Sequence, residues 1–228
     1  MNTILKLSQL TTLIIEKLEF DKATPFVEGT FHLTNLETFG LMFDGKPMPQ
    51  LERLGDFVIG SGSRKLRKII VSEGILRKLS PMKLPKLQTL SAFGTRPYFH
   101  VQIRPILLEI IESPVRTIEI LELVGMEYYT KRFTRDSIDR DRMLWEHSDR
   151  ILQDPAFSRL REIRLLFDYT AWESEHSLQD CVEEDSCIRC SIDQVAVDVR
   201  SILRATSERG VRITYDLTYG PEGLLSIQ

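Results

Sequence analysis

The sequence predicts an α/β fold in which a curved parallel sheet carries helices on its convex side, in the manner of a solenoid. An apolar pattern recurs along the 228 residues, and the last two apolar positions of each copy are two residues apart. Segments with helical spacing separate the copies. Spacing of two puts both side chains on one face of a short strand, whereas spacing of three and four is typical of a helix. Strands joined by such long crossovers pair in parallel.

The recurring pattern places apolar residues at the first, fourth, seventh and ninth positions of a copy. Complete copies start at Leu7, Leu33, Leu84, Val115 and Phe157. A copy at residues 66–71 lacks the first apolar residue, and residues 211–215 read as a closing strand. One copy alone cannot bury its apolar face, so stacked copies build one continuous core. We expect short strands around residues 13–15, 39–41, 69–71, 90–92, 121–123, 163–165 and 211–215.

Helical stripes lie between these strands. Pro105 fits the first turn of one helix, Thr134 or Asp136 can cap another, and Gly210 ends the last. We expect a single domain over 1–228, with insertions at 127–150, which holds a long helix, and at 170–192, which is polar. The stripes are Leu51, Leu54 and Val58; Ile103, Ile106, Leu107, Ile110 and Ile111; Ile138, Trp145 and Leu152; and Val195, Val199 and Ile202.

The composition is that of a folded domain, with 42% hydrophobic and 28% charged residues. No stretch approaches the roughly 18 apolar residues that span a membrane, and the N-terminus carries no secretory pattern. Three cysteines bunched between residues 181 and 190 do not make a disulfide framework. We expect an intracellular protein of the cytoplasm or nucleus that is not secreted and has no membrane partner.

The repeated pattern resembles a leucine-rich repeat of the strand-plus-helix kind over about residues 7–217. A narrower likeness lies in the order Trp145, Asp149, Leu152, Pro155, Phe157, Leu160 and Ile163, followed later by Arg209, Gly210 and Val211. This order is similar to the C-terminal repeat region of fungal F-box/leucine-rich-repeat proteins, although no F-box is visible in the chain. The resemblance implies a substrate-recognition role in a cullin-type ubiquitin ligase.

The alternate residues of each strand would line the concave face of the sheet, which is called the opposite face below. Apolar side chains there would form a discontinuous ridge of the kind that marks an interaction surface. The alternative is that insertions fold over this face and bury it. We predict a protein partner, no cofactor, and contacts from Ile14, Met42, Lys68, Ile70, Phe93, Ile120, Glu122, Arg164 and Leu166.

Charge is distributed unevenly along a chain whose formal net charge is -3. Residues 46–104 hold twelve basic and three acidic residues, a net charge of +9, whereas residues 171–200 carry -6. The basic stretch supports a competing function, the binding of nucleic acid or a phosphate ligand. Because few aromatic residues interleave with it, we favour a solvated or protein-binding strip. The basic patch comprises Arg64, Lys65, Arg67, Lys68, Arg77 and Lys78.

A candidate metal site is formed by side chains of the types that zinc prefers. The gaps between them do not match a zinc knuckle, so we expect an acidic insertion with reduced thiols instead. No nucleophile elbow, metallopeptidase helix or phosphate loop occurs in the sequence, and we expect a protein that is not an enzyme. The candidate metal ligands are His176, Cys181, Cys187 and Cys190.

The ends of such a sheet need covering, because an end strand presents unpaired backbone groups. The first copy begins at Leu7. We expect its outer edge to pair with an N-terminal domain missing from this chain or with a second copy of the chain.

Overall fold

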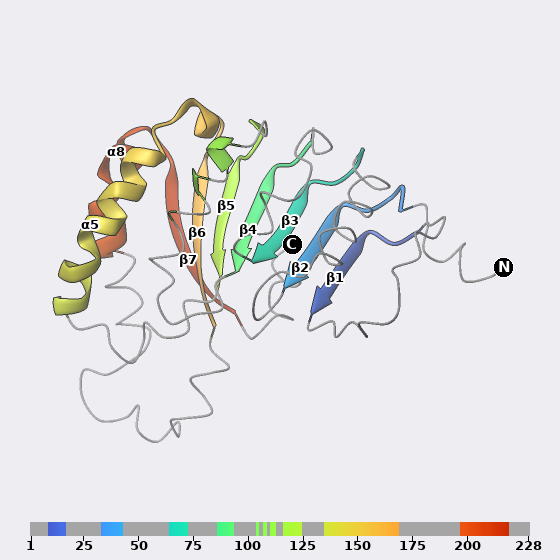
Figure 1. Cartoon of the computed structure of the whole chain (residues 1–228), viewed down its shortest axis with the longest axis horizontal. Coiled ribbons are helices and arrows are strands. Elements are labelled where there is room, and N and C mark those ends of the chain that lie inside the picture. Colours follow the sequence, from blue (N-terminus) through green and yellow to red (C-terminus); the bar gives the residue numbers. More distant parts are fainter. Residues whose placement is uncertain are drawn as a thin grey trace, which may run out of the picture.

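The computed structural model contains an α/β fold built on one seven-stranded sheet (Figure 1). The strands are β1 (Thr12–Glu16), β2 (Thr38–Met42), β3 (Lys68–Ser72), β4 (Thr89–Phe93), β5 (Ile120–Val124), β6 (Glu162–Asp168) and β7 (Arg212–Thr218). The helices whose bounds are described are α5 (Arg135–Ile151), the short 3-10 helix η2 (Pro155–Phe157) and α8 (Arg204–Glu208), and residues 107–108, 110–112 and 197–202 are also helical. The structure describes residues 9–16, 33–42, 64–72, 86–93, 104, 107–108, 110–112, 116–124, 135–168 and 197–218.

Every neighbouring pair of strands is parallel, and the order of strands in the sheet is their order in the chain. One backbone contact recurs between successive copies: the carbonyl just before one strand accepts hydrogen bonds from two N–H groups at the start of the next. The Glu37 carbonyl accepts from Arg67 N at 2.9 Å and from Lys68 N at 3.0 Å. The same paired contact is made by the carbonyls of Thr11, Arg67, Gln88 and Glu119.

The core lies on one face of the sheet and consists of the apolar positions that recur two apart in the sequence. Phe39, Ile69, Leu90, Leu121 and Ile163 stand side by side in the strand register. All five are at most 1% exposed. This arrangement confirms the predicted parallel sheet and the predicted inward face. An apolar side chain stabilises the fold by about 25 cal/mol for each Å² removed from water, so the continuous row is a main source of stability.

Helical residues cover this core from the same side. Leu107 and Ile110 come from one helical segment, Trp145 from α5, and Val199 and Ile202 from the turns before α8, and all pack in the core cluster. They belong to three of the stripes predicted from the sequence. The α5 helix also confirms the long helix predicted within residues 127–150. Figure 1 shows α5 and α8 side by side at the β7 end of the sheet.

The carboxylate of Asp149, on α5, caps the start of α8. The N-cap residue Leu203 provides no side-chain cap, and a helix start leaves several N–H groups without partners. Asp149 accepts hydrogen bonds from Ala205 N at 3.0 Å, from Thr206 N at 2.9 Å and from the Thr206 hydroxyl at 2.5 Å. One side chain thus joins elements that are more than fifty residues apart in the chain.

The turn after α8 is fixed by the next two residues. The Arg209 guanidinium donates to the carbonyls of Leu152 at 2.8 Å and Phe157 at 3.2 Å. Gly210 has a φ of 90°, a conformation that favours glycine, and so lets the chain enter β7. Four residues of the narrower likeness, Asp149, Leu152, Phe157 and Arg209, therefore take part in hydrogen bonds that join α5, η2 and α8.

The closing strand predicted at 211–215 ends at Tyr215, whose side chain is 38% exposed, because β7 is the last strand of the sheet and has a neighbour on one side only. The predicted insertion at 170–192 lies outside the described residues. In the part of the chain that the structure describes, no helix has the length and apolar character needed to cross a membrane.

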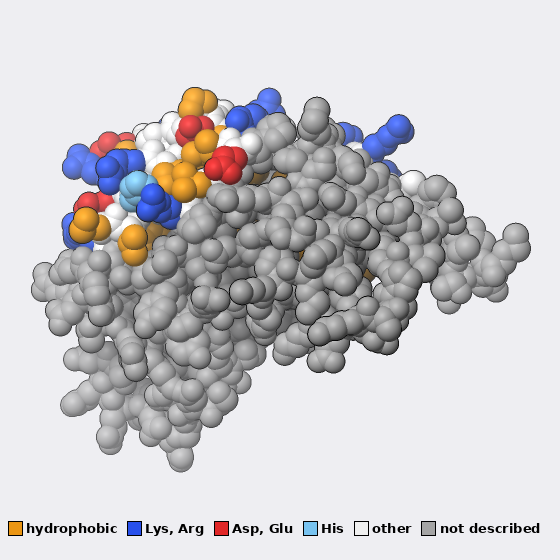
Figure 2. Space-filling view, viewed as in Figure 1, with side chains coloured by type: hydrophobic (Ala, Val, Ile, Leu, Met, Phe, Trp, Pro, Cys, Tyr) orange, Lys and Arg blue, Asp and Glu red, His pale blue; other side chains and the backbone are white. Residues whose placement is uncertain are grey.

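The turns that lead into the strands bring basic side chains to the end of the sheet where the strands begin. Arg64, Lys65 and Arg67 precede β3, Lys86 precedes β4, and all are exposed. Figure 2 shows lysine and arginine side chains along the upper edge of the molecule, where the strands begin.

The Asp149 cap leads to a stability prediction. Asp149→Ala removes all three hydrogen bonds and leaves a buried N–H group without a partner, so we expect a loss of about 2 to 3 kcal/mol in the free energy of unfolding. Asp154→Ala is the matched control, because Asp154 accepts one hydrogen bond, from Ala156 N at 2.8 Å; it should lose about 1 kcal/mol. Urea unfolding followed by circular dichroism measures both. Equal losses in the two variants would contradict this role of Asp149.

Candidate functional site

The strand register arranges the opposite face of the sheet in rows. One row, called the central row, contains Ile14, Gly40, Ile70, Ser91, Glu122, Arg164 and Thr214. The row beside it, nearer the strand starts, is called the leading row and contains Thr12, Thr38, Lys68, Thr89, Ile120, Glu162 and Arg212. The central row changes from apolar to polar between β3 and β4, and the charged side chains gather from β3 to β7.

Glu122 is the centre of the first cluster. Its side chain is 1% exposed and receives three partners from three strands. Lys68 Nζ lies 2.8 Å from Glu122 Oε2, and Arg164 Nη1 lies 3.1 Å from Oε1. The Ser91 hydroxyl donates a hydrogen bond to Oε2. Because a buried carboxylate without partners is very unfavourable, these contacts are what allow Glu122 to stand in a buried position.

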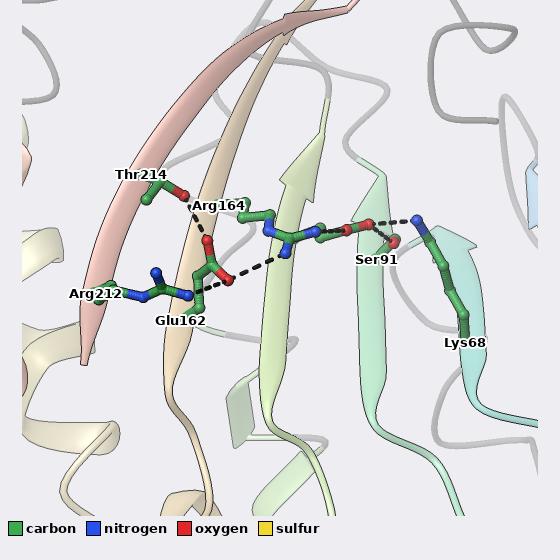
Figure 3. Close-up of polar contacts among 7 residues, drawn as sticks. Lys68, Ser91, Glu162, Arg164, Arg212 and Thr214 are labelled. Atoms are coloured by element: carbon green, nitrogen blue, oxygen red, sulfur yellow. Dashed lines mark hydrogen bonds and ion pairs between the residues drawn. The ribbon is translucent and has the colours of Figure 1, made fainter. Parts of the chain in front are cut away.

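Glu162 is the centre of the second cluster, and Arg164 joins the two (Figure 3). Arg164 Nη2 lies 3.1 Å and Arg212 Nη2 3.3 Å from Glu162 Oε2, while the Thr214 hydroxyl donates to Oε1 at 3.1 Å. Burial raises the pKa of the Glu162 carboxyl, but the hydrogen bonds from Arg164 and Thr214 and the charges of Arg164 and Arg212 outweigh it. The pKa therefore lies below its ordinary value of 4.5. The hydrogen bond with Glu162 is the main cause that raises the pKa of Arg164.

We call these seven residues the charged row: Lys68, Ser91, Glu122, Glu162, Arg164, Arg212 and Thr214. It contains three cations and two carboxylates. The carboxylates are the more deeply buried groups, since the side chain of Glu122 is 1% and that of Glu162 is 10% exposed. The cations are more exposed: the side chain of Lys68 is 17%, that of Arg164 27% and that of Arg212 73% exposed. The charged row therefore presents positive charge to the solvent above a buried layer of negative charge.

The structure brings together three of the residues predicted for partner contact, Lys68, Glu122 and Arg164. Sequence reasoning missed Ser91, Glu162, Arg212 and Thr214 as site residues. Their signal was the alternation of each strand, since Glu162 and Arg164 are two apart and so are Arg212 and Thr214. The pairing itself required the register between β6 and β7.

The expectation of an accessible apolar ridge is wrong at two positions. Ile70 is 0% and Leu166 is 1% exposed. Both side chains are apolar, and the hydrophobic effect favours their removal from water on this face as on the other. Glu122, also expected to contact a partner, is enclosed by Lys68 and Arg164. Ile14 and Ile120 are partly buried, and the side chains of Met42 and Phe93 are not described.

The predicted basic patch divides into two parts. Lys68 belongs to the charged row, whereas Arg64, Lys65 and Arg67 are exposed in the turn before β3. Arg77 and Lys78 lie outside the described residues, as do the candidate metal ligands His176, Cys181, Cys187 and Cys190. Among the residues that are described, no group of three or more His, Cys, Asp and Glu side chains could hold a metal ion.

The enclosed position of Glu122 predicts a large effect of neutralising it. Glu122→Gln leaves Lys68 and one arm of Arg164 without a carboxylate, so we expect a loss of about 3 kcal/mol in the free energy of unfolding. Glu146→Gln, on the exposed side of α5, is the matched control and should change this free energy by about 0.5 kcal/mol or less. Urea unfolding measures both variants. If Glu122→Gln were as mild as the control, the charged row would not be a stabilising structure.

The lowered pKa of Glu162 predicts acid sensitivity. A carboxyl whose pKa is lower in the folded state stabilises the fold above its unfolded pKa and loses this contribution as pH falls through its folded pKa. We expect the stability of the native sequence to fall as pH drops below about 4.5, with a shallower fall for Glu162→Gln. Thr214→Val removes one hydrogen bond to Glu162. The pH dependence of its stability should be intermediate between those of the native sequence and Glu162→Gln. Thermal unfolding at several pH values would contradict the prediction if all three slopes coincided.

Comparisons with protein-family models, with curated proteins and with solved structures find no match to this chain. Its function is therefore inferred from the residues and contacts described above.

Proposed function

We propose that this chain is a non-catalytic protein-binding module, built as a leucine-rich-repeat-like solenoid, whose leading row is the recognition strip. The solenoid is supported by the strand order, which follows the chain from β1 to β7, and by the carbonyl contact repeated between successive copies. Repeats stacked in this way contact mainly their neighbours and present a long, regular surface, which is the usual binding surface of such proteins.

The observation that carries the proposal is the charged row itself. It holds side chains from β3, β4, β5, β6 and β7 in fixed positions through ion pairs and hydrogen bonds. A surface whose side chains are already ordered loses little conformational entropy when a partner binds. Positive charge on the outside favours a partner with acidic groups, through electrostatic complementarity.

The leading row is the more accessible of the two rows. Thr38, Lys68, Thr89 and Ile120 are partly buried, Arg212 is exposed and Glu162 is buried, whereas Gly40, Ile70, Ser91 and Glu122 of the central row are buried. Ile120 stands between Thr89 and Glu162 in the register. An apolar side chain flanked by polar and charged ones is a common composition for the centre of a protein interface.

The state of the two carboxylates favours binding over catalysis. A general acid or base needs a carboxyl that can exchange a proton near the working pH and reach a substrate. Glu162 has a lowered pKa and accepts from Arg164, Arg212 and Thr214, while Glu122 is enclosed by its partners. Both groups therefore act as supports for the cations above them.

The resemblance to fungal F-box/leucine-rich-repeat proteins suggests a role for the bound protein. It implies that the bound protein is a substrate presented to a cullin-type ubiquitin ligase. Asp149 and Arg209, which carry part of this likeness, join α5, η2 and α8, and Trp145 packs in the core cluster. The likeness thus involves residues that act together in packing, which supports a shared architecture.

Affinity capture followed by mass spectrometry tests the recognition strip. We expect Ile120→Glu combined with Arg212→Glu to lose the proteins captured by the native sequence, because the double change adds negative charge to the leading row. Met143→Glu combined with Arg150→Glu on α5 is the matched control, since Met143 is 76% exposed and Arg150 is exposed. Circular dichroism checks that both variants fold. A captured set shared by all three proteins would rule out the leading row as the binding surface.

A further inference from the structure

A line of basic side chains runs past the N-terminal ends of the central strands, and it is separate from the charged row. We call it the basic rim; it consists of Lys65, Arg67, Lys86, Arg116, Arg159 and Arg161. All six are exposed and lie within four residues before β3, β4, β5 or β6. The paired carbonyl contacts hold these lead-in turns next to one another. With neighbouring strands about 4.8 Å apart, the basic rim extends over about 14 Å.

Most of the basic rim differs from the charged row in how its charge is balanced; the exception is Arg116, which has partners of its own. Within the described part of the chain, Arg67, Lys86 and Arg159 have no ion-pair partner, and Arg161 lies 3.9 Å from Glu119 at an exposed position. Lys65 donates to the amide oxygen of Asn35 at 2.6 Å, which leaves its charge in place. Like charges held this close repel one another. An anionic partner laid along the edge would relieve the repulsion.

We propose that the basic rim binds an acidic, extended segment of a partner protein, independently of the opposite face. Four of the six side chains are arginines, whose planar guanidinium groups form paired hydrogen bonds with carboxylates. In an extended peptide, side chains on one side recur about every 6.6 Å. Such a segment can therefore place several carboxylates along the rim.

The composition of the turns favours a peptide over nucleic acid. Binding of single strands relies on aromatic side chains that stack on bases, and none occurs in residues 64–67, 86–88, 116–119 or 158–161. Glu37 and Glu119 stand among the cations of these turns and would repel a continuous phosphate backbone. The chain also carries a net charge of -3, which disfavours a long polyanion beyond the rim.

Fluorescence anisotropy of the full chain tests the proposal, with a labelled peptide that alternates glutamate and serine as the probe. We expect binding at about 50 mM salt that weakens severalfold at about 200 mM. Arg67→Gln combined with Lys86→Gln should weaken binding about five- to tenfold at the lower salt concentration. Arg142→Gln combined with Arg150→Gln is the matched control, because it removes the same charge from exposed positions on α5. It should bind nearly as well as the native sequence, and circular dichroism confirms that both variants fold.

Three results would overturn the proposal. The first is no detectable binding of the peptide at low salt. The second is an equal loss in the rim variant and the α5 control, which would show an effect of net charge alone. The third is a labelled DNA duplex that binds more tightly than the peptide and loses affinity in the rim variant, which would assign the basic rim to nucleic acid.

Discussion

The paired contact of one carbonyl with two N–H groups of the next copy is the constraint on which the molecule depends. It occurs where β2, β3, β4, β5 and β6 begin, so these strands enter the sheet at the same level as their neighbours. Equivalent residues then stand side by side, and a chain pattern with a period of two becomes rows that cross the sheet. The inward rows give the continuous core, the leading and central rows give the charged row, and the lead-in turns give the basic rim. The core, the charged row and the basic rim therefore all follow from one repeated backbone geometry.

The charged row specifies the register of the strands more strictly than the apolar core does. A slip of one residue between parallel strands would turn the apolar side chains outward, and the core alone forbids it. A slip of two residues would keep the alternation and leave the core pattern acceptable. Between β5 and β6, however, such a slip would move Glu122 from Arg164 to a position opposite Glu162 or Leu166. A buried carboxylate facing a second carboxylate or an apolar side chain is strongly unfavourable. The ion pairs therefore select the observed register, whatever their net contribution to stability.

Much of the sheet could be predicted because its signal is local. The spacing of Leu90 and Ala92, or of Leu121 and Leu123, identifies a strand and its inward face without knowledge of any other part of the chain. The burial of Ile70 and Leu166 could not be predicted in this way, because it depends on residues distant in sequence that share the opposite face. The same holds for Asp149, whose carboxylate caps a helix more than fifty residues further along. Glu162 could be placed on the opposite face by alternation, but its pairing with Arg212 required the register of the last two strands.

The position of Arg164 between two carboxylates has a consequence for how this sequence can diverge. Its two nitrogens bind different strands, so its loss would leave Glu122 and Glu162 underneutralised at once. Replacement of Glu122, Glu162, Arg164 and the partly buried Lys68 together by apolar residues of similar volume would avoid that penalty, since such a swap is often neutral or favourable. Homologous chains should therefore show these four positions changing as a set, and their covariation would record how the register of the strands was fixed.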